Sequence, residues 1–368
     1  MKLTTWEDLC EELSPNLSIT HRRLKDGRTL HMDKEEKVRI AMAHWSTDSS
    51  YTELQYLYGL SASFLQKVID EVAEAVIVTF KDRYLHPDGP FFREADPEVI
   101  PKSFDYRDHT FSSPYRHFEG GLGQLDGTHM RVVVEKLSDM ARYRNRKGWP
   151  SNNVLLMCDD FLIFRFVFVG SEGSAGDAKV LGFSKLRAIL NAMPVGCFAL
   201  GDAGYGLEER ILVPYQGVRY HLKEFRGAAG VDNRPMNAKE LYNLRHSSLR
   251  VTIEKAIGVL KKRFKRLRTC LYGKYETQNR TIMACALLHN FIMEQFDEVD
   301  IAAHNVTAAE MAVDEAENLE ATFNARIADA DVNGVAESRR QHIANGMWRE
   351  YCSDHGFSDE ILEDGLIV

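Results

Sequence analysis

The chain has 368 residues, a formal net charge of −8, 44% hydrophobic residues and 27% charged residues. This composition is ordinary for a globular protein, and the length suits two domains or one domain with appendages. The absence of any run of about 18 apolar residues argues against a membrane protein. The amino terminus also lacks the basic-then-apolar layout of a secretory signal. Six scattered cysteines without a CxxC pair favour reduced thiols over a zinc cluster.

Charge is distributed unevenly along the chain. Residues 291–337 hold twelve acidic residues and one basic residue, so the remainder carries a net charge of +3. Within that remainder, residues 237–268 hold ten Lys or Arg residues and two Glu residues. The net negative charge therefore does not exclude a nucleic-acid partner, because the positive charge is concentrated in one segment.

Residues 1–112 predict a mostly helical amino-terminal domain. Asp33 and Ser50 each stand three residues before a Glu, as in the capping boxes that begin helices, and Gly59 suits a helix end. From Ser61 onward apolar residues recur at helical spacing, which completes a helix-turn-helix outline. Such an outline fits either a DNA-reading element or an ordinary helical hairpin. Acidic residues on the second helix disfavour DNA contact, because they would repel phosphate.

A proline-rich connector at residues 86–117 predicts a domain boundary, because proline resists regular structure. Strand-like runs follow at 122–134, 152–158, 161–169 and 195–200, and helical patterns at 177–190, 237–267 and 278–293. Strands mixed with helices in this order indicate an α/β layer structure over residues 120–295. Residues 296–368 form an acidic tail, for which we expect disorder or loose helix and one short docking helix at 339–351.

Three acids are candidates for a shared site. Asp126 interrupts the first strand-like run, Asp202 follows the strand at 195–200, and Glu254 lies on the long helix. Carboxylates that converge from two strands and a helix suit hard cations such as Mg²⁺ or Mn²⁺. Two such ions can activate a nucleophile and stabilise the leaving oxygen of a phosphodiester. Taken singly, each acid also fits a turn, a loop or a helix surface.

Two basic segments are candidate DNA contacts. The first lies within residues 142–149 and includes Arg144, Arg146 and Lys147. The second follows Glu254 and comprises Lys261, Lys262, Arg263, Lys265 and Arg266. Cations mixed with aromatic side chains in the first segment suit a DNA strand with stacked bases, although a plain solvated loop has the same composition.

Eight motifs within residues 120–295 follow the order found in one known family. They are LDGTH (125–129), YRNRKG (143–148), GSAGD (173–177), LGDAGY (200–205), PYQGVRYHLKEF (214–225), NAKELYNLRHSSLR (237–250), IEKAIGVLKKRF (253–264) and LLHNF (287–291). On these motifs the region resembles the nuclease domain of PIF/Harbinger transposases and of the nucleases derived from them, which are members of the DDE superfamily.

The resemblance implies an RNase H-like fold and a DDE triad at Asp126, Asp202 and Glu254. It also implies metal-dependent cleavage of DNA at transposon terminal inverted repeats, with strand transfer by a 3′-hydroxyl group. Related transposases act with a separate Myb-like protein that supplies much of the DNA targeting. We therefore expect a nuclear protein, with the cytoplasm as a second location. Whether it forms a homo-oligomer is not determined by the sequence.

One departure from the family pattern is Gly176, which stands where the family usually has His. It leaves Asp177 as either a helix cap or an accessory ligand. Separately, His129 of the LDGTH motif is either a site residue or a packing residue. Two other functions are a domesticated, non-catalytic DNA- or chromatin-binding protein and a helix-turn-helix transcription factor. Loss of a triad acid would favour the first of these. All three acids are present, so we predict a metal-dependent DNA endonuclease or transposase.

Overall fold

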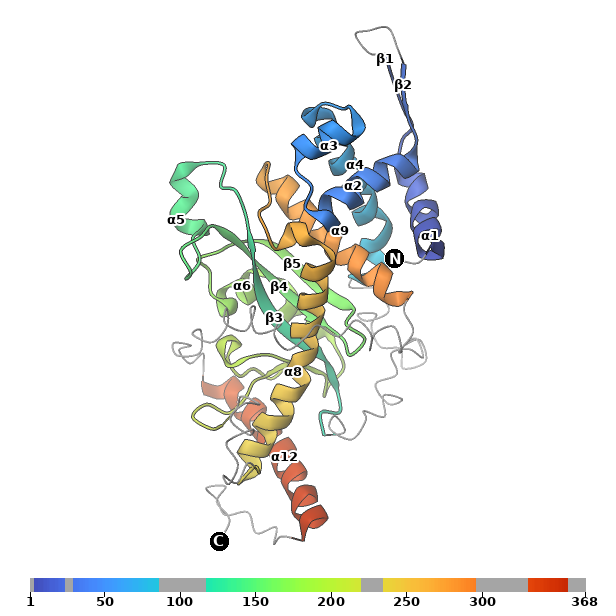
Figure 1. Cartoon of the computed structure of the whole chain (residues 1–368). Helices are drawn as coiled ribbons and strands as arrows, with labels where there is room; N and C mark the ends of the chain where they lie inside the picture. Colours follow the sequence, from blue (N-terminus) through green and yellow to red (C-terminus); the bar gives the residue numbers. More distant parts are fainter. Residues whose placement is uncertain (1–2, 24–28, 86–116, 220–233, 296–329, 357–368) are drawn as a thin grey trace.

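The computed structural model describes residues 3–23, 29–85, 117–219, 234–295 and 330–356 (Figure 1). The proline-rich connector with its predicted domain boundary, and most of the acidic tail, lie outside these ranges. None of the helices in these ranges combines the length and apolar character that crossing a membrane requires.

The amino-terminal region contains helices and a small two-stranded ribbon. Its elements are α1 (Leu3–Leu13), β1 (Thr20–Arg23), β2 (Thr29–Met32), α2 (Lys34–Thr47), α3 (Tyr51–Tyr58) and α4 (Ala62–Tyr84). Asp33 accepts a hydrogen bond from Glu36 N at 2.7 Å, Ser50 and Glu53 form a capping box, and Gly59 ends α3 in the left-handed conformation. These helix starts and this end match the prediction, whereas the β1–β2 ribbon stands in a region that we expected to be helical.

The predicted helix-turn-helix outline is present as α3 and α4, but the acidic side of α4 pairs with other parts of the protein. Helix α4 lies along α9 (Tyr275–Glu294) (Figure 1). Glu71 accepts a hydrogen bond of 2.7 Å from the buried Lys37 ammonium, and Glu74 lies 2.9 Å from Arg280 on α9. These contacts favour the ordinary helical hairpin over a DNA-reading helix.

A mixed five-stranded sheet forms the centre of the following region. Its strands are β3 (Gly121–Arg131), β4 (Ser151–Cys158), β5 (Phe164–Glu172), β6 (Phe198–Leu200) and β7 (Ile211–Leu212). The spatial order is β5-β4-β3-β6-β7, with antiparallel pairing among β3, β4 and β5 and parallel pairing of β6 with β3 and β7. This mixed α/β architecture agrees with the predicted RNase H-like fold.

Helices cover both faces of the sheet. On one face α8 (Ala238–Arg263) and α9 pack with α4, and they enclose Met130 of β3 and Val132 just after it. On the other face α6 (Asp177–Phe183) and α7 (Leu186–Ala192) pack on Leu125. Because successive side chains of a strand point to opposite faces, Asp126 shares the α8 face with Met130. The fold thus directs Asp126 toward the long helix.

A carboxyl-terminal helix, α12 (Ala330–His355), is longer than the expected short helix at 339–351. It lies beside the amino-terminal half of α8 (Figure 1). Met347 and Trp348 are buried in a core shared with Tyr242 of α8, and the Arg340 guanidinium stands 3.9 Å from the Tyr215 ring centroid. The segment that follows the acidic tail is therefore part of the folded core.

Candidate metal and DNA site

Asp126 lies in the middle of β3 and is buried, with 3% of its surface exposed. Its Oδ1 accepts a hydrogen bond of 2.9 Å from Gly127 N and lies 3.3 Å from the Arg250 guanidinium of α8. An ionised carboxylate in such a position needs positive charge nearby, because burial penalises its charged form. Arg250 provides part of that charge.

Glu254 stands one helical turn after Arg250 on α8, as predicted. Its Oε1 lies 3.9 Å from the same guanidinium, so Arg250 stands between two of the three predicted triad acids. Residues four apart share one face of a helix, which explains why Arg250 and Glu254 meet at the same point of the sheet. Nothing in the sequence indicated the contact between Arg250 and Asp126.

Asp202 follows β6 directly, as predicted, and caps the short 3₁₀ helix at Ala203–Tyr205. Its Oδ1 accepts a hydrogen bond of 2.9 Å from Gly204 N. β6 lies beside β3 in parallel, so the carboxyl end of β6 comes close to the middle of the longer β3. The negative charge of Asp202 raises the pKa of both Asp126 and Asp177, which places the three acids in one electrostatic cluster.

A fourth acid, Asp177, belongs to the same cluster. It is the first residue of α6, and its Oδ1 lies 3.3 Å from the Asn153 amide nitrogen of β4. An added Cβ at Gly127 would lie only 2.5 Å from that oxygen, so glycine is needed for this close approach. Sequence reasoning left Asp177 as a cap or an accessory ligand; the described hydrogen bonds show no side-chain cap, and the carboxylate points toward β3 and β4.

The electrostatics of the cluster show a deficit of positive charge. Burial raises the pKa of Asp126 to about 8; Arg250 opposes this rise, and the charges of Asp202, Glu254 and Asp177 add to it. Burial likewise raises the pKa of Asp177 to about 6, and the charge of Asp202 adds to that rise. A divalent cation would stabilise the ionised form of these groups, because opposite charge favours a carboxylate.

The clustered side chains offer oxygen ligands, which are the type that a hard cation prefers. Tyr205 Oη and Asn153 Oδ1 are buried beside the carboxylates and have no hydrogen-bond partner among the described residues. Buried polar atoms are normally satisfied, so such atoms are expected where water or a ligand completes a site. The side chains do not form a closed site, however, since no three His, Cys, Asp or Glu residues in the described ranges lie close enough to share a metal ion.

The first basic segment lies near this cluster. Arg144, Arg146 and Lys147 are exposed, on the loop that joins the short helix α5 (Met140–Tyr143) to β4. The charge of Arg146 opposes the rise of the Asp177 pKa, so its guanidinium is within electrostatic reach of the acids. These positions suit contact with a phosphate backbone approaching the acids.

The second basic segment divides between solvent and interior. Lys262 and Lys265 are exposed, whereas Lys261 and Arg266 are buried and Arg263 is partly buried. Arg263 contacts His289 Nδ1 at 3.2 Å, and Arg266 donates to Ser49 O at 2.7 Å and lies 2.9 Å from Asp48. The prediction that all five residues face DNA needs correction: Arg263 and Arg266 make contacts within the protein, because the end of α8 packs against α9 and the amino-terminal helices.

His129 lies on the opposite face of β3 from Asp126, because it is three residues farther along the strand. Its Nδ1 is 3.0 Å from Ser151 Oγ, and its ring contacts Trp149 edge-on. Burial, together with the nearby charge of Arg146, lowers the pKa of His129 to about 4. His129 therefore lies beneath the basic loop and lines a pocket there, away from the side of β3 that carries Asp126.

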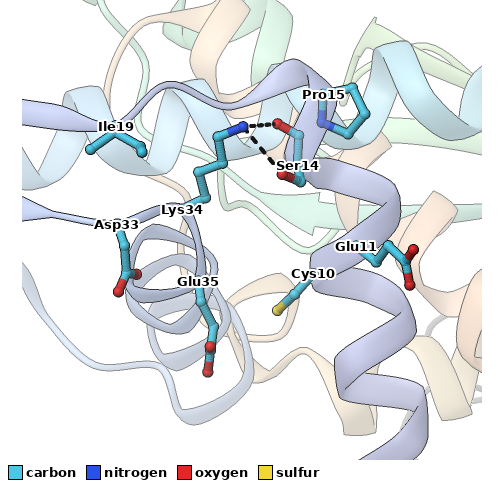
Figure 2. Close-up of a pocket in the computed structure, with 8 residues that line it drawn as sticks. All are labelled: Cys10, Glu11, Ser14, Pro15, Ile19, Asp33, Lys34 and Glu35. Carbon is cyan, nitrogen blue, oxygen red and sulfur yellow. Dashed lines mark hydrogen bonds between the residues drawn. The ribbon is translucent and has the colours of Figure 1, made fainter.

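A second pocket lies on the amino-terminal helices, between α1 and the start of α2 (Figure 2). Lys34 donates hydrogen bonds to Ser14 O at 2.6 Å and to Ser14 Oγ at 3.1 Å, so its ammonium is engaged within the pocket wall. Burial raises the pKa of the Cys10 thiol to about 11, which keeps it protonated near neutrality. This pocket shows no constellation suited to phosphodiester chemistry.

Known proteins resemble this chain over the same region. Residues 125–290 match the family described as DDE superfamily endonuclease. The protein named Putative nuclease HARBI1 from Homo sapiens is 26% identical over 290 residues, which is 78% of this chain and 73% of that protein. The one from Rattus norvegicus is 26% identical over 271 residues, 73% of this chain and 69% of that protein. Protein ALP1-like from Arabidopsis thaliana is 20% identical over 314 residues, 80% of this chain and 69% of that protein. No solved structure gives a significant match. Residues 125–290 therefore resemble DDE superfamily endonucleases, and the chain is distantly similar to HARBI1 and to ALP1-like.

Proposed function

We propose that this protein is a Harbinger-type endonuclease or transposase that cleaves phosphodiester bonds of DNA with the help of Mg²⁺ or Mn²⁺. The observation that carries the proposal is the electrostatic coupling of the buried Asp126 on β3 to Asp202 at the end of β6 and to Glu254 on α8. Resemblance to the DDE endonuclease family over residues 125–290 supports the same chemistry.

Asp126, Asp202 and Glu254 would hold the divalent ions, with Asp177 as a nearby fourth carboxylate. Bound ions of this kind activate the attacking water or 3′-hydroxyl group and offset the charge that develops on the phosphate. The chain itself holds the metal-binding oxygens in place, because the Gly127 and Gly204 amides donate hydrogen bonds to the carboxylates of Asp126 and Asp202. Carboxylates that are already oriented lower the free-energy cost of assembling the metal site.

Exposed cations would hold the DNA beside the acids. Arg144, Arg146 and Lys147 lie on the loop after α5, from which Arg146 acts on Asp177. Lys262 lies in the last turn of α8, and Lys265 follows that helix. Contacts of this kind go to the phosphate backbone, so they position the strand without selecting a base sequence. The selection of transposon terminal inverted repeats would then come from another surface or from a separate Myb-like partner in the nucleus.

The test is cleavage of duplex DNA that carries candidate inverted repeats, with Mg²⁺ or Mn²⁺ and with or without EDTA. The proposal expects product only with the divalent ion, and a loss of at least about a thousandfold in Asp126→Asn and in Glu254→Gln. Equal cleavage by either variant, with its fold verified by circular dichroism, would refute the assignment.

A second candidate function is a domesticated DNA- or chromatin-binding protein without catalysis. Arg250 favours it, because its guanidinium lies within 3.3 Å of Asp126 and 3.9 Å of Glu254 and supplies positive charge without a metal. In this candidate, the Arg250 guanidinium stays between Asp126 and Glu254, and divalent ions do not displace it. DNA binding that is independent of Mg²⁺, together with no metal binding, would support this candidate over the endonuclease.

A further inference from the structure

A pocket of about 820 Å³ opens beside Asp177 of the acidic cluster, on the α6 face of β3 and opposite the side chain of Asp126. It is lined by Gly127 and His129 of β3, by Asn153 of β4, by residues of the segment 137–146, which carries α5, and by the segment 173–177. Gly127 follows Asp126 in the strand, and Asp177 belongs to both the pocket and the cluster. A molecule in the pocket would thus contact Asp177, one acid of the cluster, on the opposite face of β3 from the Asp126 side chain.

One polar atom in this pocket is buried without a partner. Asn153 is 1% exposed, and its amide nitrogen donates to Ala175 O at 2.9 Å and approaches Asp177 Oδ1 at 3.3 Å. These donations fix the amide, and they leave Asn153 Oδ1 without a donor in the described part of the chain. A buried acceptor of this kind normally has a hydrogen-bond partner, so it points to a ligand that brings an N–H group or a water molecule.

The rest of the lining combines positive charge with apolar surface. Arg144 and Arg146 are exposed at the pocket. The apolar side chains of Leu137, Met140 and Ala141 line it from the same segment, residues 137–146. Leu137 is 87% exposed, so its apolar side chain is accessible to a ligand. Cations suit a phosphate, an apolar wall suits the flat face of a base, and a buried amide oxygen suits the N–H groups on the edge of a base.

We propose that this pocket receives one unpaired nucleotide of the bound DNA, beside Asp177 of the acidic cluster. The inference rests on the proposed DNA function. It adds that one nucleotide of the bound DNA is unpaired at the site. A pocket of this size encloses one small molecule and excludes a stretch of double helix, so a base can enter only after it leaves the stack. DNA with a nucleotide that is already unpaired avoids the unstacking cost, and it should bind more tightly.

The test compares two short duplexes that differ by a single bulged thymidine, with Ca²⁺ in place of Mg²⁺ to suppress cleavage. Fluorescence anisotropy of the full chain is expected to give an affinity about tenfold higher for the bulged duplex. Gly176→Leu should reduce this preference to near unity, because Gly176 lines the pocket. Its φ of −72° suits any residue, and an added Cβ would meet no atom within 4 Å, so the leucine fills space without backbone strain.

Gly346→Leu is the matched control, because Gly346 also has open space at its Cβ position but lies on α12, away from the pocket. It should keep the wild-type preference. Equal affinity of the wild-type protein for the two duplexes would overturn the pocket inference and leave the endonuclease proposal standing. A preference that persists in Gly176→Leu would also overturn it, because bending of the bulged DNA would then explain the difference. No binding to either duplex would refute both proposals.

Discussion

The two basic segments, 144–147 and 261–266, have similar charge but different surroundings. In the first, Arg144 and Arg146 are exposed beside the acids. In the second, Arg266 is buried against Asp48 and Ser49, and Arg263 contacts His289. A cluster of cations therefore indicates DNA binding only where the fold leaves the cations in solvent. Elsewhere the same residue types join helices through charged hydrogen bonds.

The largest expected effect is a loss of stability when the buried second segment is mutated. Arg266→Ala should cost about 3 kcal/mol of stability, because it leaves Asp48 without its buried cation and Ser49 O without its donor. The melting temperature should fall by about 6 °C or more. Thermal unfolding of this variant beside Arg268→Ala, which removes an exposed cation two residues away, measures the effect. An unchanged melting temperature with weaker DNA binding would assign Arg266 to the DNA surface.

At the exposed segment the opposite result is expected. Arg144→Ala combined with Arg146→Ala should weaken DNA binding about tenfold at moderate salt and leave the melting temperature unchanged. The slope of log affinity against log salt should decrease in magnitude by about 2, because two phosphate contacts are lost. Arg349→Ala, an exposed cation on α12, serves as the control. A salt slope equal to that of the wild-type protein would exclude this loop from the DNA contact.

A smaller effect concerns the pH dependence of stability without metal. The pKa of Asp126 is raised to about 8 in the folded state, from about 3.9 in the unfolded chain, so the folded protein binds this proton more tightly. The contribution to stability is complete below about pH 4 and is lost as the pH rises through about 8. Asp177, with a pKa of about 6, adds a loss in the lower part of that range.

In EDTA, the wild-type protein should therefore lose at least about 1 kcal/mol more stability than Asp126→Asn between about pH 5 and about pH 8. Denaturant unfolding at several pH values measures this difference. Identical pH profiles for the two proteins would show that the Asp126 carboxylate is not in the buried, repulsive surroundings described above.

Several parts of the site could be predicted from the sequence because they depend on local patterns. The apolar runs that flank Asp126 and precede Asp202 indicated two strands, and the apolar spacing around Glu254 indicated one long helix. The order of these elements was enough to predict the fold class. Strands that follow each other directly pair antiparallel, and a strand that follows helices can pair in parallel, so a mixed sheet is expected. The side-chain cap at Asp33 and the capping box at Ser50 are equally local.

Other parts depend on contacts between distant residues. Arg250 could not be placed beside Asp126, because that contact depends on how α8 lies on β3. The burial of Arg266 depends on the packing of the amino-terminal helices against the end of α8. Asp177 was noticed through its motif, but only the pairing of β3 with β4 and the position of α6 bring it close to Gly127 and Asn153.

The central claim is that Asp126, Asp202 and Glu254 form a site for divalent ions despite the intervening Arg250 guanidinium. Titration of the protein with Mn²⁺, followed by electron paramagnetic resonance of the free ion, tests this claim directly at pH 8. Saturable binding that Mg²⁺ competes away, and that is lost in both Asp126→Asn and Glu254→Gln, is the predicted result. Binding of equal strength in the wild-type protein and Asp126→Asn, or no binding in the wild-type protein, would contradict the claim.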